Sequence, residues 1–113
     1  MDNYSPQLDS VFQALADPTR RAVIDRLGDG PASITDLARP FDMALPSFLK
    51  HIHVLEQSGL IQTRKEGRVR TCAISPRAFS AIEQWLAVQR AAWESHADRL
   101  EQFVLNDIEE ETP

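Results

Sequence analysis

The chain has 113 residues, of which 42% are apolar and 26% are charged, and its formal net charge is −5 at pH 7. This length supports one hydrophobic core and excludes two enzyme domains of ordinary size, while no segment reaches the roughly 18 consecutive apolar residues that a membrane helix needs. Residues 1–6 lack the basic and apolar regions of a secretory signal, so we expect a cytoplasmic protein with no membrane partner.

The first two predicted elements are helices. Four apolar residues recur at the spacing of one helix face, which predicts a helix over residues 7–16. These residues are Leu8, Val11, Phe12 and Leu15. Asp17 stands directly before Pro18, and an N-cap aspartate followed by proline in the first turn is typical of a helix start. The second helix should end at the glycines and proline of residues 28–31.

A short third helix and a longer fourth helix follow. Ser33 or Thr35 is the expected N-cap of the third helix, and Pro40 should end that helix early. The fourth helix is predicted over residues 45–57. Its apolar face should consist of Leu45, Phe48, Ile52 and Leu55.

The last third of the chain predicts a hairpin and one long helix. Two strand-like runs, residues 60–65 and 69–74, flank a turn that contains Gly67. The last helix should begin at residue 76 and extend to about residue 106, which leaves residues 107–113 as a frayed acidic tail. The predicted fold is therefore mainly α, with five helices and a β-hairpin, in a single domain over residues 1–113.

Charge is distributed unevenly along the chain. Residues 45–77 carry six basic residues against two acids, a net charge of +4, whereas residues 1–44 and 78–113 are acidic. Because the local potential of a surface depends on such patches, an acidic total does not exclude an anionic partner.

The fourth helix combines its apolar face with a second face of small, polar and basic residues. This outward face consists of Pro46, Ser47, Lys50, His53 and Gln57. A helix with this face fits the major groove of double-stranded DNA, where it can donate to phosphates and base edges. The alternative interpretation is an ordinary solvated helix face.

Four basic residues surround the hairpin turn: Arg64, Lys65, Arg68 and Arg70. At that place they would follow a phosphate backbone or enter a minor groove. Charges at a hairpin tip also serve to block edge pairing, which is the alternative. The fourth helix and the hairpin together favour DNA binding.

Several motifs in these elements resemble the ArsR/SmtB family of winged helix-turn-helix repressors, over about residues 8–75. They are Ala14-Leu15-Ala16-Asp17-Pro18-Thr19-Arg20-Arg21, Asp36-Leu37-Ala38, Leu45-Pro46-Ser47, Lys50-His51-Ile52-His53-Val54-Leu55-Glu56, Gly59-Leu60-Ile61 and Glu66-Gly67-Arg68-Val69-Arg70. The resemblance implies a homodimer that binds an inverted-repeat operator. It also implies that the fourth helix is the recognition helix and that the hairpin is the wing. On that helix we expect Ser47, His53 and Pro46 near the base edges, with His51 at a flank.

The chain departs from the family pattern at two positions. Ala44 stands where a serine often precedes the recognition helix, and the missing hydroxyl removes a cap worth about 1 kcal/mol. Leu49 stands where a small polar residue is expected. Its side chain either contacts a thymine methyl group or adds to the packing, and we favour packing.

Neither a metal site nor a cofactor site is expected. The cysteine pair that binds metals in the third helix of many relatives is missing, and His96, Asp98 and Glu101 are poorly aligned on the last helix. The single cysteine, Cys72, excludes an intramolecular disulfide and is expected to be a half-buried structural thiol. A sulfenic acid or an intersubunit bridge at Cys72 is the open alternative.

The last helix has a seven-residue apolar repeat at Phe79, Leu86, Trp93 and Leu100. A helix of about 46 Å would outreach a domain of this size, so it should either break or pack on another chain. The repeat favours a helix-pair interface in a homodimer, although the first half of the helix should cover its own core. The resemblance adds the first helix, which gives the predicted interface Leu8, Val11, Phe12, Trp85, Leu86, Trp93, Leu100 and Phe103.

No sequence motif indicates an enzyme, since phosphate loops and nucleophile elbows are missing. We therefore predict a sequence-specific DNA-binding transcriptional regulator, in particular a homodimeric repressor. The alternatives are a winged-helix module that binds protein instead of DNA, and a metal- or redox-responsive sensor of the same fold. DNA binding that weakens steeply with salt separates the first alternative from the prediction.

Overall fold

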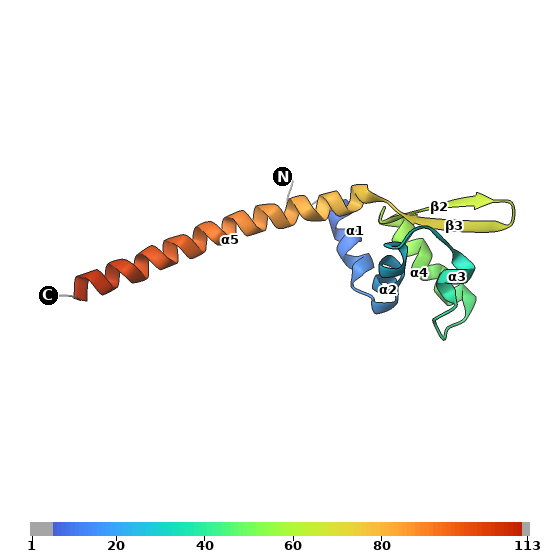
Figure 1. The fold of residues 1–113 in the computed structure, drawn as a ribbon, viewed down its shortest axis with the longest axis horizontal. Helices are drawn as coiled ribbons and strands as arrows, with labels where there is room; N and C mark the ends of the chain where they lie inside the picture. The colour runs from blue at the N-terminus through green and yellow to red at the C-terminus, as the bar shows by residue number, and fades with distance from the viewer. Residues whose placement is uncertain (1–5, 112–113) are drawn as a thin grey trace. The chain divides into compact units, whose positions relative to one another are not determined.

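The computed structural model describes residues 6–111. The chain forms two compact units, Met1–Ala81 and Ile82–Pro113. The described residues form five helices and three strands, in the order shown in Figure 1. These are α1 (Pro6–Leu15), α2 (Pro18–Leu27), β1 (Ala32–Ser33), α3 (Ile34–Ala38), α4 (Leu45–Gln57), β2 (Ile61–Glu66), β3 (Val69–Ile74) and α5 (Pro76–Glu111). The predicted fold class, mainly helical with a β-hairpin wing, is confirmed.

The helix starts follow the capping residues of the sequence. Asp17 caps α2, where its carboxylate accepts from the backbone amide of Arg20 at 3.0 Å. Ser33, and not Thr35, caps α3, because its hydroxyl oxygen accepts from the amide of Asp36 at 3.1 Å. Ala44 gives α4 no side-chain cap, as expected.

The sheet has one strand more than the sequence predicts. Its order is β1-β3-β2, with both pairs antiparallel, and the short strand β1 pairs Ala32 with Cys72. Two residues are too few for a strand periodicity, which explains why β1 escapes prediction. Glu66 pairs with Val69, so Gly67 is the first of the two residues in the hairpin turn. Its φ is 64°, a left-handed conformation that glycine adopts without steric cost.

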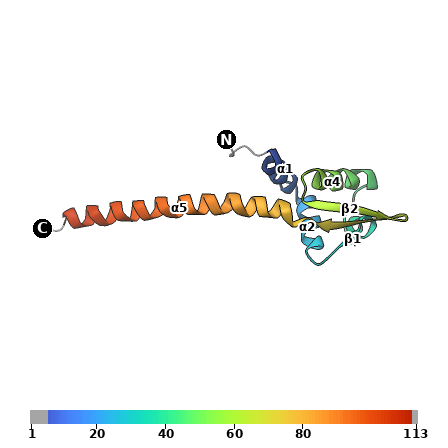
Figure 2. The ribbon, with the colours of Figure 1, turned by 90° about the horizontal axis from the view of Figure 1, so that it is seen from above.

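The core of the first unit lies between the sheet and the helices. Fully buried side chains come from α1, α2, α4, the residue before β2 and both long strands, and they include Val11, Val23, Phe48, Leu55, Leu60, Ile61 and Cys72. The ring of Phe41 adds a tilted contact to Phe48, with centroids 5.5 Å apart. Figures 1 and 2 show α4 beside the hairpin, whose tip projects past the helices of this unit. The core therefore fixes α4 against the base of the hairpin.

Helix α5 is longer than predicted. It continues to Glu111, past the predicted end at residue 106, so the expectation of fraying from residue 107 is wrong for residues 107–111, and residues 112–113 lie outside the described residues. All described side chains from Glu83 to Glu109 are exposed in the single chain. Within the described residues, no helix combines the length and the apolar character that crossing a membrane requires.

Candidate nucleic-acid interface

Helix α4 has one buried face and one exposed face. Phe48, Ile52 and Leu55 are at most 4% exposed, which anchors the helix in the core. The outward face that the sequence predicts is exposed at every position: Pro46, Ser47, Lys50, His53 and Gln57. Leu45 is a correction, because it is 54% exposed and does not belong to the buried face. It lies in the first turn of α4, where the core beneath the helix ends.

His51 does not lie on the outward face. Its ring nitrogen Nδ1 is 3.1 Å from Nη1 of Arg20 and 3.7 Å from a carboxylate oxygen of Asp17. Since an arginine side chain only donates, Nδ1 is the acceptor of that hydrogen bond. The expectation that His51 flanks the base contacts is therefore corrected, because this side chain joins α4 to the start of α2.

Arg20 completes this connection through the end of α1. Its Nε donates to the carbonyl oxygen of Ala14 at 2.7 Å, and its Nη2 donates to that of Gln13 at 3.1 Å. One guanidinium thus holds the α1 C-terminus, the α2 N-terminus and α4 together. The sequence gives no direct signal for this, because the two partners Arg20 and His51 are 31 positions apart.

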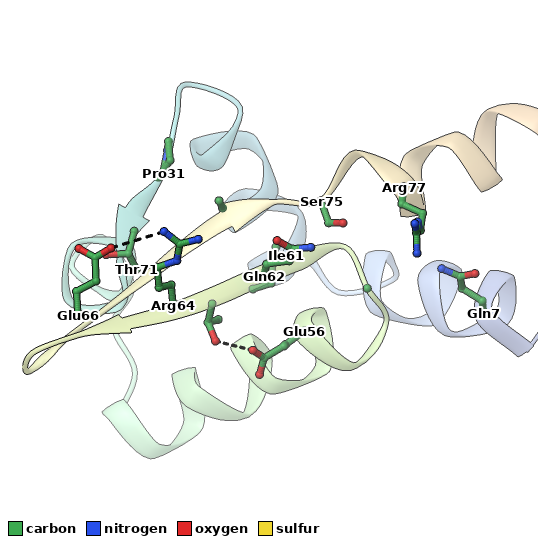
Figure 3. A pocket seen from close by; sticks show the side chains of 13 residues that line it. Gln7, Pro31, Glu56, Ile61, Gln62, Arg64, Glu66, Thr71, Ser75 and Arg77 are labelled. Atoms are coloured by element: carbon green, nitrogen blue, oxygen red, sulfur yellow. Dashed lines mark hydrogen bonds and ion pairs between the residues drawn. The ribbon is translucent and has the colours of Figure 1, made fainter.

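The four basic residues of the hairpin are all exposed, but they are not equivalent. In the register of β2 and β3, Arg70 pairs with Lys65, and Arg64 pairs with Thr71. Because side chains alternate along a strand, Arg64 points to the opposite face of the hairpin from Lys65 and Arg70. Arg64 also lies 3.9 Å from the carboxylate of Glu66 (Figure 3). The hairpin therefore offers its cations on two faces and at its tip.

Arg70 ties the hairpin to α4. Its Nη1 donates to the hydroxyl oxygen of Thr63 at 3.0 Å, and that hydroxyl donates to the carboxylate of Glu56 on α4 (the lower dashed line in Figure 3). This series of hydrogen bonds links the wing to the C-terminal end of α4, the helix whose outward face carries Lys50 and His53. These two hydrogen bonds therefore join α4 to the hairpin.

A hollow of about 410 Å³ lies between α3, α4 and the hairpin tip. Its lining consists of Ser33, Ile34, Thr35, Leu49, Arg68, Val69 and Arg70. Leu49 is 41% exposed and Val69 is 51% exposed. Leu49 is therefore not a core residue, and the packing that the sequence favoured for it is at most partial. Val69 was not singled out from the sequence, where it reads as an ordinary strand residue.

A second, larger hollow of about 1000 Å³ follows β2 and the face of the sheet that carries Arg64 (Figure 3). Its ionic groups are partly paired within the chain, since Arg64 approaches Glu66, and Glu56 accepts from Thr63. The arrangement offers a mixed polar surface with no concentration of one charge.

The structure changes the predicted set of interface residues. Val11 is fully buried and Leu8 is 9% exposed, so their side chains have almost no surface left for a partner. Phe12 is 40% exposed. The predicted residues of α5 are exposed to between 37% and 71%, namely Trp85, Leu86, Trp93, Leu100 and Phe103. The corrected prediction rests on Phe12 and α5.

Neither His96 nor Cys72 belongs to a ligand cluster. Among the residues that the structure describes, no group of three His, Cys, Asp or Glu side chains is placed to hold a metal ion. Cys72 is fully buried, not half-buried, and burial together with the charge of Glu56 raises the pKa of its thiol to about 11, against the opposing charge of Arg70.

Comparisons with known proteins agree with this geometry. Residues 15–64 match the model of a helix-turn-helix domain family. The chain is 64% identical to the ArsR family transcriptional regulator RHA00566, whose crystal structure superimposes with a TM-score of 0.80 over 84% of this chain and 98% of that one.

Two curated relatives are also similar. The HTH-type transcriptional regulator Rv2034 of Mycobacterium tuberculosis is 36% identical over 66% of this chain and 69% of its own length. The transcriptional repressor SdpR of Bacillus subtilis is 34% identical over 70% of this chain and 88% of its own length.

Proposed function

Because the chain belongs to the ArsR family of winged helix-turn-helix transcriptional regulators, we propose that it represses transcription in the cytoplasm by binding an inverted-repeat operator as a homodimer. The observation that carries this proposal is the pairing of a helix that has a polar, exposed face with a basic hairpin on one unit. The exposed face of α4 lies beside a hairpin with four exposed cations. A recognition helix in the major groove and a wing on the adjacent backbone need this arrangement.

The proposed roles follow from exposure and chemistry. Lys50 and Arg68 contact phosphates, because both are exposed and neither side chain forms a hydrogen bond or an ion pair among the residues that the structure describes. Arg64, Lys65 and Arg70 add charge around the wing. Ser47, His53 and Pro46 lie nearest the base edges, while His51 acts indirectly, by holding α4.

The proposed homodimer rests on the exposed apolar residues of α5 in the second unit. Trp93 is 68% exposed, Leu100 57% and Phe103 71%, and a single chain offers these side chains to water. Large apolar side chains gathered on one helix favour association with another apolar surface. A second copy supplies the same stripe, as a two-fold interface requires.

A binding experiment tests the proposal. The affinity of the full chain is measured for a genomic fragment from upstream of its own gene and for random duplex DNA, each at two salt concentrations. Retention of the upstream fragment over random DNA, weakening steeply as salt rises, is the expected result. Absence of binding to either DNA at low salt would overturn the proposal and favour a module that binds protein.

A further inference from the structure

Leu49 is an apolar side chain on a surface that is otherwise polar and basic. On α4 it lies three residues from Pro46 and four from His53, which places the three side chains along one stripe of the helix. It is 41% exposed, although the neighbouring Phe48 is fully buried. The core therefore does not account for a leucine at this position.

The surroundings of Leu49 point to DNA as its occupant. Leu49 and Val69 line the hollow between α4 and the wing together with Arg68 and Arg70, whose charges complement phosphates. In the major groove, the C5 methyl group of thymine is the apolar group that base edges present. An apolar side chain held at a basic recognition surface thus has one apolar partner among the base edges.

We propose that Leu49 is a specificity-determining residue that contacts the methyl group of a thymine in each operator half-site, with Val69 closing the hollow from the wing side. This inference rests on the proposed function. Lys50, the next residue, is exposed and contacts the DNA backbone in this proposal, while Leu49 selects the base. The operator accordingly contains a thymine at one fixed position in each half-site.

The test replaces single thymines of the operator by deoxyuridine, which removes the methyl group and keeps every hydrogen-bonding group. The operator is first selected from random duplexes with the full chain. Burial of one methyl group corresponds to about a fourfold change in affinity. We expect one thymine per half-site at which deoxyuridine weakens binding about fourfold, and about 15-fold when both half-sites are changed.

Two variants assign the effect to Leu49. Leu49→Ala should bind the thymine and deoxyuridine operators equally, with normal folding by circular dichroism, since the side chain is partly exposed. The matched control is Leu45→Ala, which also removes an exposed leucine from α4 but lies outside the hollow. Leu45→Ala should keep the methyl dependence.

The outcomes separate this inference from the proposed function. Selection of an operator with no thymine whose methyl group matters overturns the inference and leaves the proposed repressor intact, since sequence-specific binding has then been shown. Retention of the methyl dependence by Leu49→Ala also overturns it. Failure to select any sequence from the random duplexes overturns the proposed function itself.

Discussion

Nδ1 of His51, on α4, accepts a hydrogen bond from Nη1 of Arg20, on α2, at 3.1 Å. Because Arg20 also donates to the carbonyl oxygens of Gln13 and Ala14, this one side chain of α2 connects α4 to the end of α1. The position of α4 therefore depends on contacts outside its own sequence.

Loss of the His51 ring should lower both stability and DNA affinity. His51→Ala leaves the Arg20 guanidinium without one of its three acceptors, and a hydrogen bond of this kind is worth about 1–2 kcal/mol. Arg20→Ala should cost more, because it removes all three bonds, whereas Arg26→Ala on the exposed side of α2 should change little. Urea denaturation measures the free energies of unfolding. Equal stabilities of the His51→Ala variant and the parent chain would contradict the structural role.

Asp17 should make stability depend on pH in the acid range. Burial acts to raise the pKa of its carboxyl, but the hydrogen bond from the amide of Arg20 and the positive charge of the Arg20 guanidinium act in the opposite direction, and the pKa lies below 3.8. The unfolded chain then binds more protons than the native chain, so the contribution of Asp17 is present above pH 4 and is lost as the pH falls through the lowered pKa.

Asp17→Asn tests this linkage, because asparagine also caps helices but does not titrate. The variant should be less stable than the parent chain at pH 7, and the difference should shrink toward pH 3. Thermal or urea unfolding at both pH values measures it. A difference that stays constant would show that the charge of Asp17 does not contribute.

The proposed phosphate contacts predict the salt dependence of DNA binding. Each lost contact lowers the slope of log affinity against log salt by about 0.9, so Lys50→Ala or Arg68→Ala in both protomers of a dimer should flatten it by about 1.8. Arg26→Ala on α2 is the control, since it removes the same charge from an exposed position that belongs neither to the proposed DNA interface nor to the apolar stripe of α5. Wild-type slopes in both Lys50→Ala and Arg68→Ala would remove these residues from the backbone contacts.

Local periodicity made much of this surface predictable. The spacing of Phe48, Ile52 and Leu55 places Ser47, Lys50 and His53 on the other side of α4, whatever the rest of the fold does. Asp17 and Ser33 likewise cap their helices through contacts three residues away. Helix faces and N-caps can be predicted from the sequence because they depend only on residues a few positions apart in the chain.

Contacts between distant segments could not be predicted in the same way. His51 meets Arg20 only because α2 packs against α4, so its place on the helix wheel alone suggested DNA. The exposure of Leu49 likewise depends on the position of the hairpin. Val11 was predicted in the dimer interface because the sequence does not show that other elements of the same chain bury it. In each case tertiary packing decided between two alternatives that the sequence left open.

The α5 stripe predicts the effect of a charge on dimerisation. Trp93→Glu places a carboxylate at a side chain that is 68% exposed in the single chain, and it should convert the dimer to monomers at micromolar concentration. Val88→Glu is the matched control, because Val88 is 64% exposed but lies about 140° around the helix from Trp93. Sedimentation equilibrium measures both. Dissociation by Val88→Glu but not by Trp93→Glu would place the interface on another face.

Cys72 should behave as a buried structural thiol. Burial and the charge of Glu56 raise its pKa to about 11, so very little thiolate exists at pH 8 and the native chain should react slowly with Ellman's reagent. Unfolding in urea should restore the ordinary rate. Rapid labelling of the native chain would instead support a redox role.

The same burial predicts how stability responds to alkaline pH and to substitution. Because the pKa of the thiol is raised in the native chain, the contribution of Cys72 to stability is complete below the ordinary value of 9.0 and is lost as the pH rises toward 11.

Cys72→Ala should remove this dependence of stability on pH and lower the free energy of unfolding by about 1 kcal/mol, since it deletes one buried sulfur. Cys72→Ser should cost more, because a hydroxyl at a fully buried position needs a hydrogen-bond partner. Urea unfolding between pH 7 and pH 10 measures all three chains, and equal stability of Cys72→Ser and the parent would contradict the burial argument.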